Sequence, residues 1–242
     1  MWKQTISRKL FIWIYFLPAA IMAQKKKTVV LTFDDAVKSQ YTLVAPLLKQ
    51  YHFGATFYVC EFPGMFGDTA NSLDWPDIKK ISDMGFEIGN HTWHHRNLPM
   101  PANDLNTELQ YIEDKCASRG IPAMHSFCYP AYHTDPGAIP ILTAHGYTSA
   151  RTGGDHVWSV ANDDAMYVPS FTIKGDDSAF FYRAVNQAEK GLIVVLTFHG
   201  VPDNTHPWVS TPPELFARYM KYLHDNHFHV VAMKDVKIKK RK

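Results

Sequence analysis

Two groups of residues stand at spacings that suit metal chemistry. In the segment HTWHH, His91 and His95 are four residues apart, which puts both imidazoles on one face of a helical turn. Such a pair can bind one divalent ion, although most pairs at this spacing are surface accidents and His94 offers an alternative partner for His91. Asp34 and Asp35 follow the apolar run TVVLTF, where an aspartate is also a common helix N-cap. One carboxylate with two histidines makes a catalytic site for a divalent metal ion, with zinc as the first candidate. The second carboxylate can then act as a general base.

Two further ionisable residues also interrupt apolar stretches. His199 follows LIVVLTF and is either a buried core histidine or a proton-transfer group. Arg151 ends the segment YTSAR and is either a surface arginine or a partner of the carboxylates. All these residues come directly after predicted strands, and the carboxyl ends of parallel strands converge on one face of an α/β fold. We therefore expect the carboxylates, imidazoles and guanidinium to meet at one mouth.

Short β-branched or aromatic runs alternate with helical stretches along the chain. The predicted strands are 28–33, 55–59, 86–89, 126–128, 147–150, 167–171, 192–198 and 230–233. The predicted helices are 40–51, 75–84, 103–119, 137–145, 178–190 and 212–224. This alternation predicts a parallel α/β architecture in a single domain, either a closed barrel or an open sheet.

The charge distribution argues against nucleic-acid binding. The 242 residues contain 25 Lys and Arg against 23 Asp and Glu, a formal net charge of +2. Eleven of the basic residues lie in 1–27 and 237–242, so residues 28–236 carry 14 basic against 23 acidic groups, or −9. A body of that charge does not suit a groove that tracks a phosphate backbone. An apolar content of 46% also excludes a disordered chain.

The first 23 residues are typical of an export signal. Lys3, Arg8 and Lys9 precede the apolar run LFIWIYFLPAAIMA, which ends at Ala23. Spanning a bilayer takes about 20 apolar residues, so this run favours a cleavable signal peptide over an anchor. We expect a signal peptide at 1–23, a catalytic domain at 24–242, a periplasmic or secreted location, and no stable membrane insertion after cleavage.

Four motifs together resemble those of the polysaccharide deacetylase family, the NodB-homology group known as carbohydrate esterase family 4. They are TFDD at 32–35, HTWHH at 91–95, FCYPAY at 127–132 and LTFHG at 196–200. Each motif is weak alone, but here the four occur in order and each follows a predicted strand. The resemblance covers residues 28 to 236 and implies a distorted (β/α) barrel with about seven parallel strands. It also implies a metal-dependent hydrolase that removes acetyl groups from N-acetylated glycans.

The resemblance assigns roles to particular positions. Asp35, His91 and His95 are the implied ligands of one divalent ion, zinc or alternatively cobalt or nickel. Asp34 is the implied general base and His199 the implied general acid. The implied substrate-binding set contains an oxyanion donor at the backbone N–H of Ala131, which follows Pro130, and a pocket for the acetyl methyl lined by Leu196.

Apart from the resemblance, five aromatic side chains in predicted loops near the same face could stack on sugar rings: Trp93, Tyr132, Trp158, His206 and Trp208. Core packing is the alternative for each of them, and above all for Trp158. We include Tyr132 and Trp158 in the substrate-binding set.

The sequence departs from the family pattern at two points. The third family motif usually begins with an arginine that pairs with the catalytic base, and Cys128 stands at that position. Arg151, at the end of the next predicted strand, is the best replacement. The family's aspartate that orients the catalytic histidine has three candidates here, Asp155, Asp163 and Asp164, and the sequence does not choose among them.

Three functions remain open from the sequence. The first is an exported deacetylase that acts on an acetylated oligo- or polysaccharide at nitrogen or oxygen. The second is a non-catalytic carbohydrate-binding protein on the same fold, and the third is a same-fold amidase acting on a non-sugar amide. The intact set of metal-binding and proton-transfer residues favours the first.

Overall fold

The computed structural model describes residues 27–238, so the predicted signal peptide at 1–23 lies outside the described residues. The strands are β1 (Thr28–Phe33), β2 (Thr56–Val59), β3 (Glu87–Asn90), β4 (Ser126–Cys128), β5 (Ser149–Arg151), β6 (Trp158–Ser159), β7 (Phe171–Thr172), β8 (Leu192–Phe198) and β9 (His229–Val231). The α-helices are α1 (Ala45–Gln50), α2 (Trp75–Asp83), α3 (Ala102–Ala117), α4 (Ala138–Ala144), α5 (Ser178–Val185) and α6 (Pro213–Asp225). Within 27–238, no helix has the length and apolar character needed to cross a membrane.

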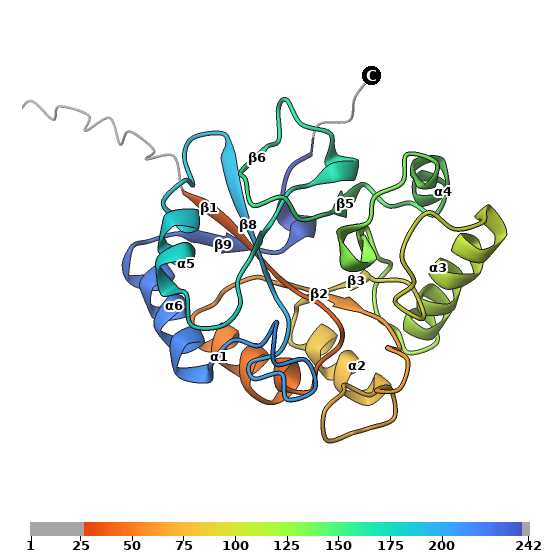
Figure 1. Ribbon diagram of the computed structural model, residues 1–242, viewed down its shortest axis with the longest axis horizontal. Coiled ribbons are helices and arrows are strands. Elements are labelled where there is room, and N and C mark those ends of the chain that lie inside the picture. The colour runs from red at the N-terminus through yellow and green to blue at the C-terminus, as the bar shows by residue number, and fades with distance from the viewer. Residues whose placement is uncertain (1–26, 239–242) are drawn as a thin grey trace, which may run out of the picture.

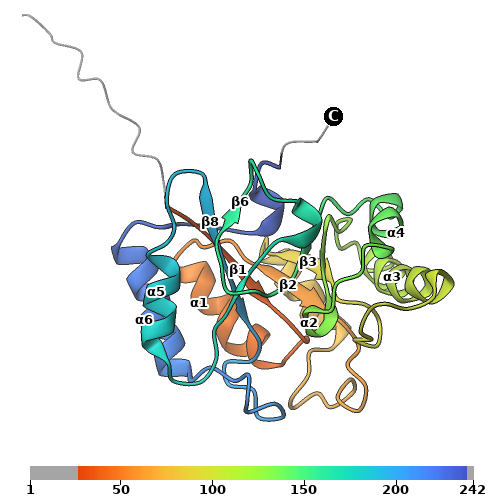
Figure 2. The same ribbon diagram turned by 45° about the horizontal axis from the view of Figure 1, so that its top comes forward.

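The strands form a sheet that curls back on itself (Figures 1 and 2). Parallel neighbours follow the order β5-β4-β3-β2-β1-β8, and β7 pairs in parallel with β8. A bridge between Arg151 and Val168 joins the segment that leads into β7 to β5. Seven parallel strands therefore surround one interior, and the expected distorted (β/α) barrel is confirmed. The distortion includes β9, which pairs only with the first half of β1, and the two-residue β6, which is antiparallel to β8.

The helices lie around the outside of the strands. In Figure 1, α5 and α6 are at one side, α3 and α4 at the other, and α1 and α2 between them. Alternate residues of each strand face opposite sides, so the strands separate two apolar cores. In β1, Val29, Leu31 and Phe33 pack in the larger core against the helices, whereas Val30 packs in the smaller core inside the barrel. Burial on both faces explains why these strands are continuous hydrophobic runs.

Two helices differ from their predicted form. The helix predicted at 40–51 begins as a π-helix, Gln40–Val44, before it continues as α1. The helix predicted at 178–190 ends at Val185, and the chain then turns through a bridge between Glu189 and Leu192. Neither change alters the order of the elements that carry the predicted site.

Candidate active site and metal centre

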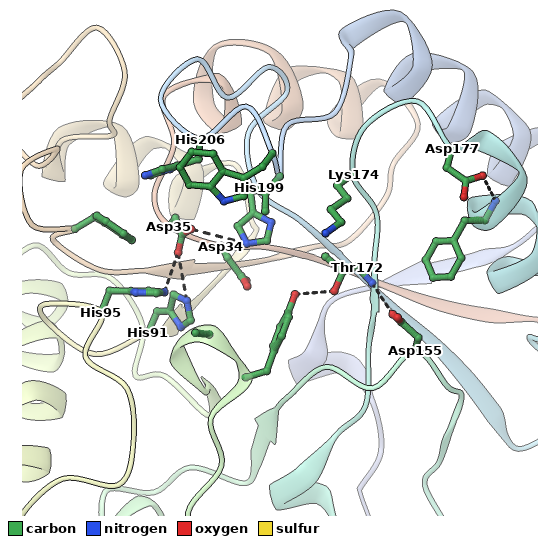
Figure 3. A pocket seen from close by; sticks show the side chains of 16 residues that line it. Asp34, Asp35, His91, His95, Asp155, Thr172, Lys174, Asp177, His199 and His206 are labelled. Carbon is green, nitrogen blue, oxygen red and sulfur yellow. Dashed lines mark hydrogen bonds and ion pairs between the residues drawn. The ribbon is translucent and has the colours of Figure 1, made fainter.

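The carboxyl ends of the parallel strands surround a pocket of about 770 Å³. Figure 3 shows the side chains that line it. They include both aspartates after β1, the two histidines after β3 and the histidine after β8; in full, the lining is Asp34, Asp35, Phe62, His91, His95, Ala131, Tyr132, Asp155, Thr172, Lys174, Asp177, Phe180, His199, His206, Trp208 and Val209. The expected convergence on one mouth is therefore present.

The end of β1 is held rigidly where its two aspartates begin. The ring of Phe33 stacks between Phe57 and Phe198 at centroid distances of 5.0 and 5.6 Å. Each such aromatic contact adds about 0.5–1.5 kcal/mol beyond burial. The fully buried amide of Gln40 donates to the backbone carbonyls of Asp34 and His199, which ties the ends of β1 and β8 together.

Three ligand atoms face one another at the centre of the pocket. Oδ1 of Asp35 lies 3.4 Å from Nε2 of His91 and 3.4 Å from Nε2 of His95. The ligand atoms of these three residues all lie within 4.8 Å of one another. Asp35 and His95 adopt left-handed backbone conformations, with φ of 70° and 52°, which turn their side chains into the pocket. Backbone in this sparsely populated region concentrates at functional sites.

The donor set fits a divalent cation. Nδ1 of His91 lies 2.9 Å from the backbone carbonyl of Cys128, so Nδ1 carries the proton and Nε2 keeps a free lone pair for a metal. Oδ1 of Asp35 is buried and has no hydrogen-bond partner within the described part of the chain, as expected for an atom that binds an ion. Two imidazoles and one carboxylate leave positions open for substrate or water.

Electrostatics keep Asp35 and His95 in the state that binds metal. Burial would lower the pKa of His91, but the neighbouring Cys128 and Asp35 outweigh burial and hold that pKa above its ordinary value, so metal binding at His91 must displace a proton. Burial raises the pKa of Asp35, but contact with His91 and the charges of the surrounding histidines outweigh it, so this pKa lies below its ordinary value. Burial and the neighbouring His91 lower the pKa of His95 to about 4, which leaves its imidazole neutral at pH 7. An ionised carboxylate and a neutral imidazole are the forms that coordinate a metal.

A second cluster, Asp34 with His91 and Cys128, suits a metal less well. Burial raises the pKa of the Cys128 thiol, and a metal ligand must be the thiolate. Asp34 is already engaged by the guanidinium of Arg151. The set that contains Asp35 is therefore the better candidate.

Arg151 reaches Asp34 from the neighbouring strand. Cys128 and Arg151 are paired residues of β4 and β5, so the guanidinium lies directly beside the position where the family arginine would stand. Its Nη2 contacts Oδ2 of Asp34 and Sγ of Cys128, and its Nη1 donates to Oγ of Ser170 at 3.1 Å. Arg151 is completely buried, with Tyr58 and Tyr132 against its two sides at 5.3 and 5.4 Å from the ring centroids. Burial would lower its pKa, but Asp34 foremost outweighs burial and holds that pKa above its ordinary value.

His199 lies on the other side of the carboxylates. Its Nε2 is 3.8 Å from Oδ2 of Asp35, so it faces the same centre as His91 and His95 (Figure 3). Its Nδ1 is buried and has no hydrogen-bond partner among residues 27–238. Asp155, Asp163 and Asp164 do not supply one. Their carboxylates accept from the backbone N–H groups of Thr172, Ser159 and Met166, respectively.

The segment after β4 forms the opposite lip of the pocket. Ala131 is exposed, lines the pocket and has a left-handed backbone with φ of 47°. Pro130 is buried and is not among the lining residues, so it acts only through the turn that it opens. Tyr132 lines the pocket, and its hydroxyl lies 2.8 Å from Oγ1 of Thr172.

Two predicted substrate-binding residues lie elsewhere. Trp158 is fully buried in the core inside the barrel, where β6 pairs with the first residues of β8, and it is not part of the pocket. Leu196 is fully buried in the core on the helix side of the sheet. Because strand residues alternate in direction, its neighbour Thr197 is the one that faces inward, where its hydroxyl donates to Ser170 at 2.9 Å. Both predictions were wrong for the same reason: large apolar side chains gain most when they are buried away from the mouth.

The structure adds pocket residues that the sequence prediction did not include. Lys174 follows β7 and points into the pocket in Figure 3. Phe62, in the loop after β2, packs between His95 and His206 at 4.8 and 5.1 Å. Gln40, which positions the ends of two strands, gave no signal because it lies inside a predicted helix. His206 and Trp208, which the sequence already offered as aromatic side chains near this face, both line the pocket.

The fold is a distorted (β/α) barrel with a candidate metal site at the carboxyl ends of its strands. The family model for polysaccharide deacetylases matches residues 22–150, just over half of the 242 residues, and the chain belongs to this family.

Curated relatives match over shorter stretches. The chain is 36% identical over 93 residues to peptidoglycan-N-acetylmuramic acid deacetylase PdaA of Bacillus subtilis, covering 38% of this chain and 33% of that protein. It is 39% identical over 75 residues to peptidoglycan-N-acetylglucosamine deacetylase of Bacillus cereus, covering 30% of this chain and 24% of that protein. The matched stretches thus span a third or less of these relatives.

Solved structures share the fold along most of the chain. The crystal structure of Bacillus subtilis PdaA, a family 4 carbohydrate esterase, superposes with a TM-score of 0.58 at 22% identity, covering 88% of this chain and 81% of that one. A CE4 family pseudoenzyme from Bacillus anthracis superposes with a TM-score of 0.60 at 17% identity, covering 87% of this chain and 65% of that one. Likeness at these identities shows the fold alone, so function must be argued from the residues in the pocket.

Proposed function

We propose that the protein is an exported, metal-dependent hydrolase that removes acetyl groups from an N-acetylated glycan. The observation that carries this proposal is the convergence of Asp35, His91 and His95 on one point, beside a carboxylate that is ion-paired to a buried arginine. The activities that the curated relatives are named for make peptidoglycan-type amino sugars the first substrates to test.

Asp35, His91 and His95 would hold one divalent ion, zinc first and cobalt or nickel as alternatives. When bound, such an ion supplies Lewis-acid chemistry, which polarises an acyl carbonyl and increases the acidity of water. The hydrogen bond from Nδ1 to the backbone carbonyl of Cys128 turns Nε2 of His91 toward the other ligands, and burial keeps His95 neutral.

Asp34 is the proposed general base. One of its oxygens contacts Arg151, and the other, Oδ1, is buried without a hydrogen-bond partner in residues 27–238 and is free to accept a proton. The guanidinium fixes the orientation of the carboxylate. General-base catalysis by a positioned group contributes about 10²–10⁴-fold.

His199 is the proposed general acid. It stands on the far side of the carboxylates from Arg151's strand and lines the pocket, where it can give a proton to the departing amine. An amide needs that proton because an amine anion is a very poor leaving group. The N–H of Ala131, on the exposed lip across the pocket, is the proposed donor to the developing oxyanion, a contact worth about 3–4 kcal/mol.

A non-catalytic binding protein on the same fold is the main alternative, because a pseudoenzyme is among the similar structures. Against it, all five ionisable residues of the proposed machinery line one pocket: Asp34, Asp35, His91, His95 and His199. A same-fold amidase for a small non-sugar amide is the second alternative. The pocket is open at its mouth and carries exposed Trp208, which suits a long glycan better than a small enclosed substrate.

Acetate release tests the proposal. The zinc-loaded protein is incubated with chitin oligomers, peptidoglycan fragments and acetylated xylan, with and without a chelator. Release that is lost with the chelator and restored by zinc supports a deacetylase, and the preferred polymer identifies the glycan and the bond. No release from any of the three with zinc, cobalt or nickel would favour the binding protein.

A further inference from the structure

The wall of the pocket above the proposed metal ligands contains a carboxylate and an imidazole that the proposed reaction does not use. The side chain of Asp203, in the loop after β8, is fully buried. Its Oδ1 accepts from the backbone N–H groups of Thr205 and His206 at 3.0 and 2.7 Å. Its Oδ2 and Nδ1 of His206 are both buried without a hydrogen-bond partner in the described chain, and they lie 3.4 Å apart. Each is therefore the available partner of the other.

The loop that carries this pair is fixed in place. Asp203 donates its N–H to Oγ of Ser210 at 2.9 Å, and Val201 donates to Oγ of Ser39 at 2.7 Å. A Cβ built at Gly200 would lie 2.5–2.8 Å from atoms of Asp203, so only glycine permits this close approach. A buried carboxylate on a fixed loop thus lies 3.4 Å from Nδ1 of His206.

His206 presents the rest of its ring to the pocket. Its side chain is 13% exposed although Nδ1 is buried, so the accessible part of the ring lies toward Nε2. The ring packs between Phe62 at 5.1 Å and Trp208 at 5.2 Å. Trp208 is 67% exposed, and no other large hydrophobic side chain of residues 27–238 is exposed to solvent. An exposed indole beside a fixed imidazole gives this wall an apolar face and one directed polar atom.

We propose that His206 is a specificity-determining residue that binds the glycan. Asp203 holds Nδ1, Nε2 hydrogen-bonds a sugar hydroxyl, and Trp208 stacks on the apolar face of a sugar ring. The combination suits a pyranose, which carries hydroxyls around its edge and C–H groups on its face. This inference rests on the proposed function, since the same pocket must hold the acetylated sugar.

Replacing His206 with Gln or with Asn distinguishes the roles of its two ring nitrogens. The amide nitrogen of Gln stands near the position of Nε2, and that of Asn near the position of Nδ1. We expect His206→Phe and His206→Asn to raise KM for the N-acetylglucosamine tetramer about tenfold, the effect of one lost hydrogen bond at the upper end of its usual range. His206→Gln should retain most of the affinity, and kcat should stay within about twofold in all three because the contact is made in both ground and transition states.

The matched control is His145→Phe. His145 has nearly the same exposure, 12%, and a carboxylate partner, Glu113, 3.0 Å from its Nδ1, but it lies between α3 and α4 outside the pocket. It should leave KM unchanged. Zinc content, measured by elemental analysis, should equal that of the wild type in every variant because His206 is not a ligand.

An unchanged KM in His206→Phe would overturn the proposal, as would a fall in kcat with KM constant. Equal losses in the Gln and Asn variants would also overturn it, because Nε2 would then have no special role. If His206→Phe does not fold, the comparison of Gln with Asn decides alone. If the wild type binds the tetramer but releases no acetate, the proposed function fails separately, and calorimetric binding of the tetramer to the same variants then tests His206.

Discussion

Replacing Arg151 with methionine tests whether the buried ion pair with Asp34 organises the site. The two side chains are 0% and 3% exposed, and the guanidinium contacts Asp34 directly. Removing one partner of a buried pair leaves an uncompensated charge and costs about 3–5 kcal/mol. For a domain of this size that corresponds to a fall in Tm of about 6–20 °C. Arg183→Met, on the exposed face of α5, is the surface control and should stay within about 0.5 kcal/mol of the wild type.

The double variant Asp34→Asn/Arg151→Met isolates the pair. It buries neither charge, so its free energy of unfolding in urea should exceed that of Arg151→Met by about 2 kcal/mol, although it carries one more substitution. Chelator is present throughout so that metal affinity does not enter the comparison. The pairing would be refuted if the losses of unfolding free energy in Asp34→Asn and Arg151→Met simply added in the double variant. It would also be refuted if Arg151→Met lost no more unfolding free energy than the surface control. Full acetate release with an unchanged pH profile in Arg151→Met would refute its functional importance.

Three further predictions concern single side chains. His199→Gln should lower kcat about 10²–10⁴-fold while zinc content stays at the wild-type level, and equal loss of zinc would instead make His199 a ligand. Trp158→Ala should lower the free energy of unfolding by about 3–5 kcal/mol and leave KM unchanged, because the indole is core and not pocket; a raised KM in a stable variant would contradict this. Burial raises the pKa of Glu87, and donors from Thr56, Ser126 and the N–H of Lys234 only partly offset it. As pH rises above 4.5, the carboxyl of Glu87 loses its proton in the unfolded chain before it does so in the folded chain. The free energy of unfolding should therefore fall between pH 4.5 and the raised pKa, by at most about 1.4 kcal/mol per pH unit. Glu87→Gln should abolish that slope in urea titrations.

The fold was predictable because its signals are local and repeated. Residues 28–33, 126–128 and 192–198 are strands with the predicted bounds, and all three are buried on both faces. The strand β6 was missed because two residues are too few to show an alternating hydrophobic pattern. It is recognisable only from its pairing with β8. The early end of α5 at Val185 was equally invisible, because the helical pattern continues to Lys190.

The site was predictable where residue type and strand position agree. The carboxylates after β1, the histidines after β3 and Arg151 at the end of β5 all come together as the sequence indicates. None of the three candidate aspartates, Asp155, Asp163 and Asp164, pairs with Nδ1 of His199 in the described chain, and each accepts from a nearby backbone N–H instead. Leu196 was assigned to the wrong face of β8, because its side chain packs in the core on the helix side of the sheet. Tertiary contacts such as the one between Gln40 and the backbone carbonyl of His199 have no signature in a single sequence.

The central claim is that one metal ion and Asp34 act together on an acetylated glycan. The most direct measurement is acetate release from an N-acetylglucosamine oligomer by the zinc-loaded wild type, Asp34→Asn and Asp35→Asn, with bound zinc determined on the same samples. The account predicts release by the wild type, full zinc but release reduced by about 10²-fold or more in Asp34→Asn, and loss of both zinc and release in Asp35→Asn. Wild-type release that is insensitive to metal removal, or undiminished release by Asp34→Asn, would contradict it.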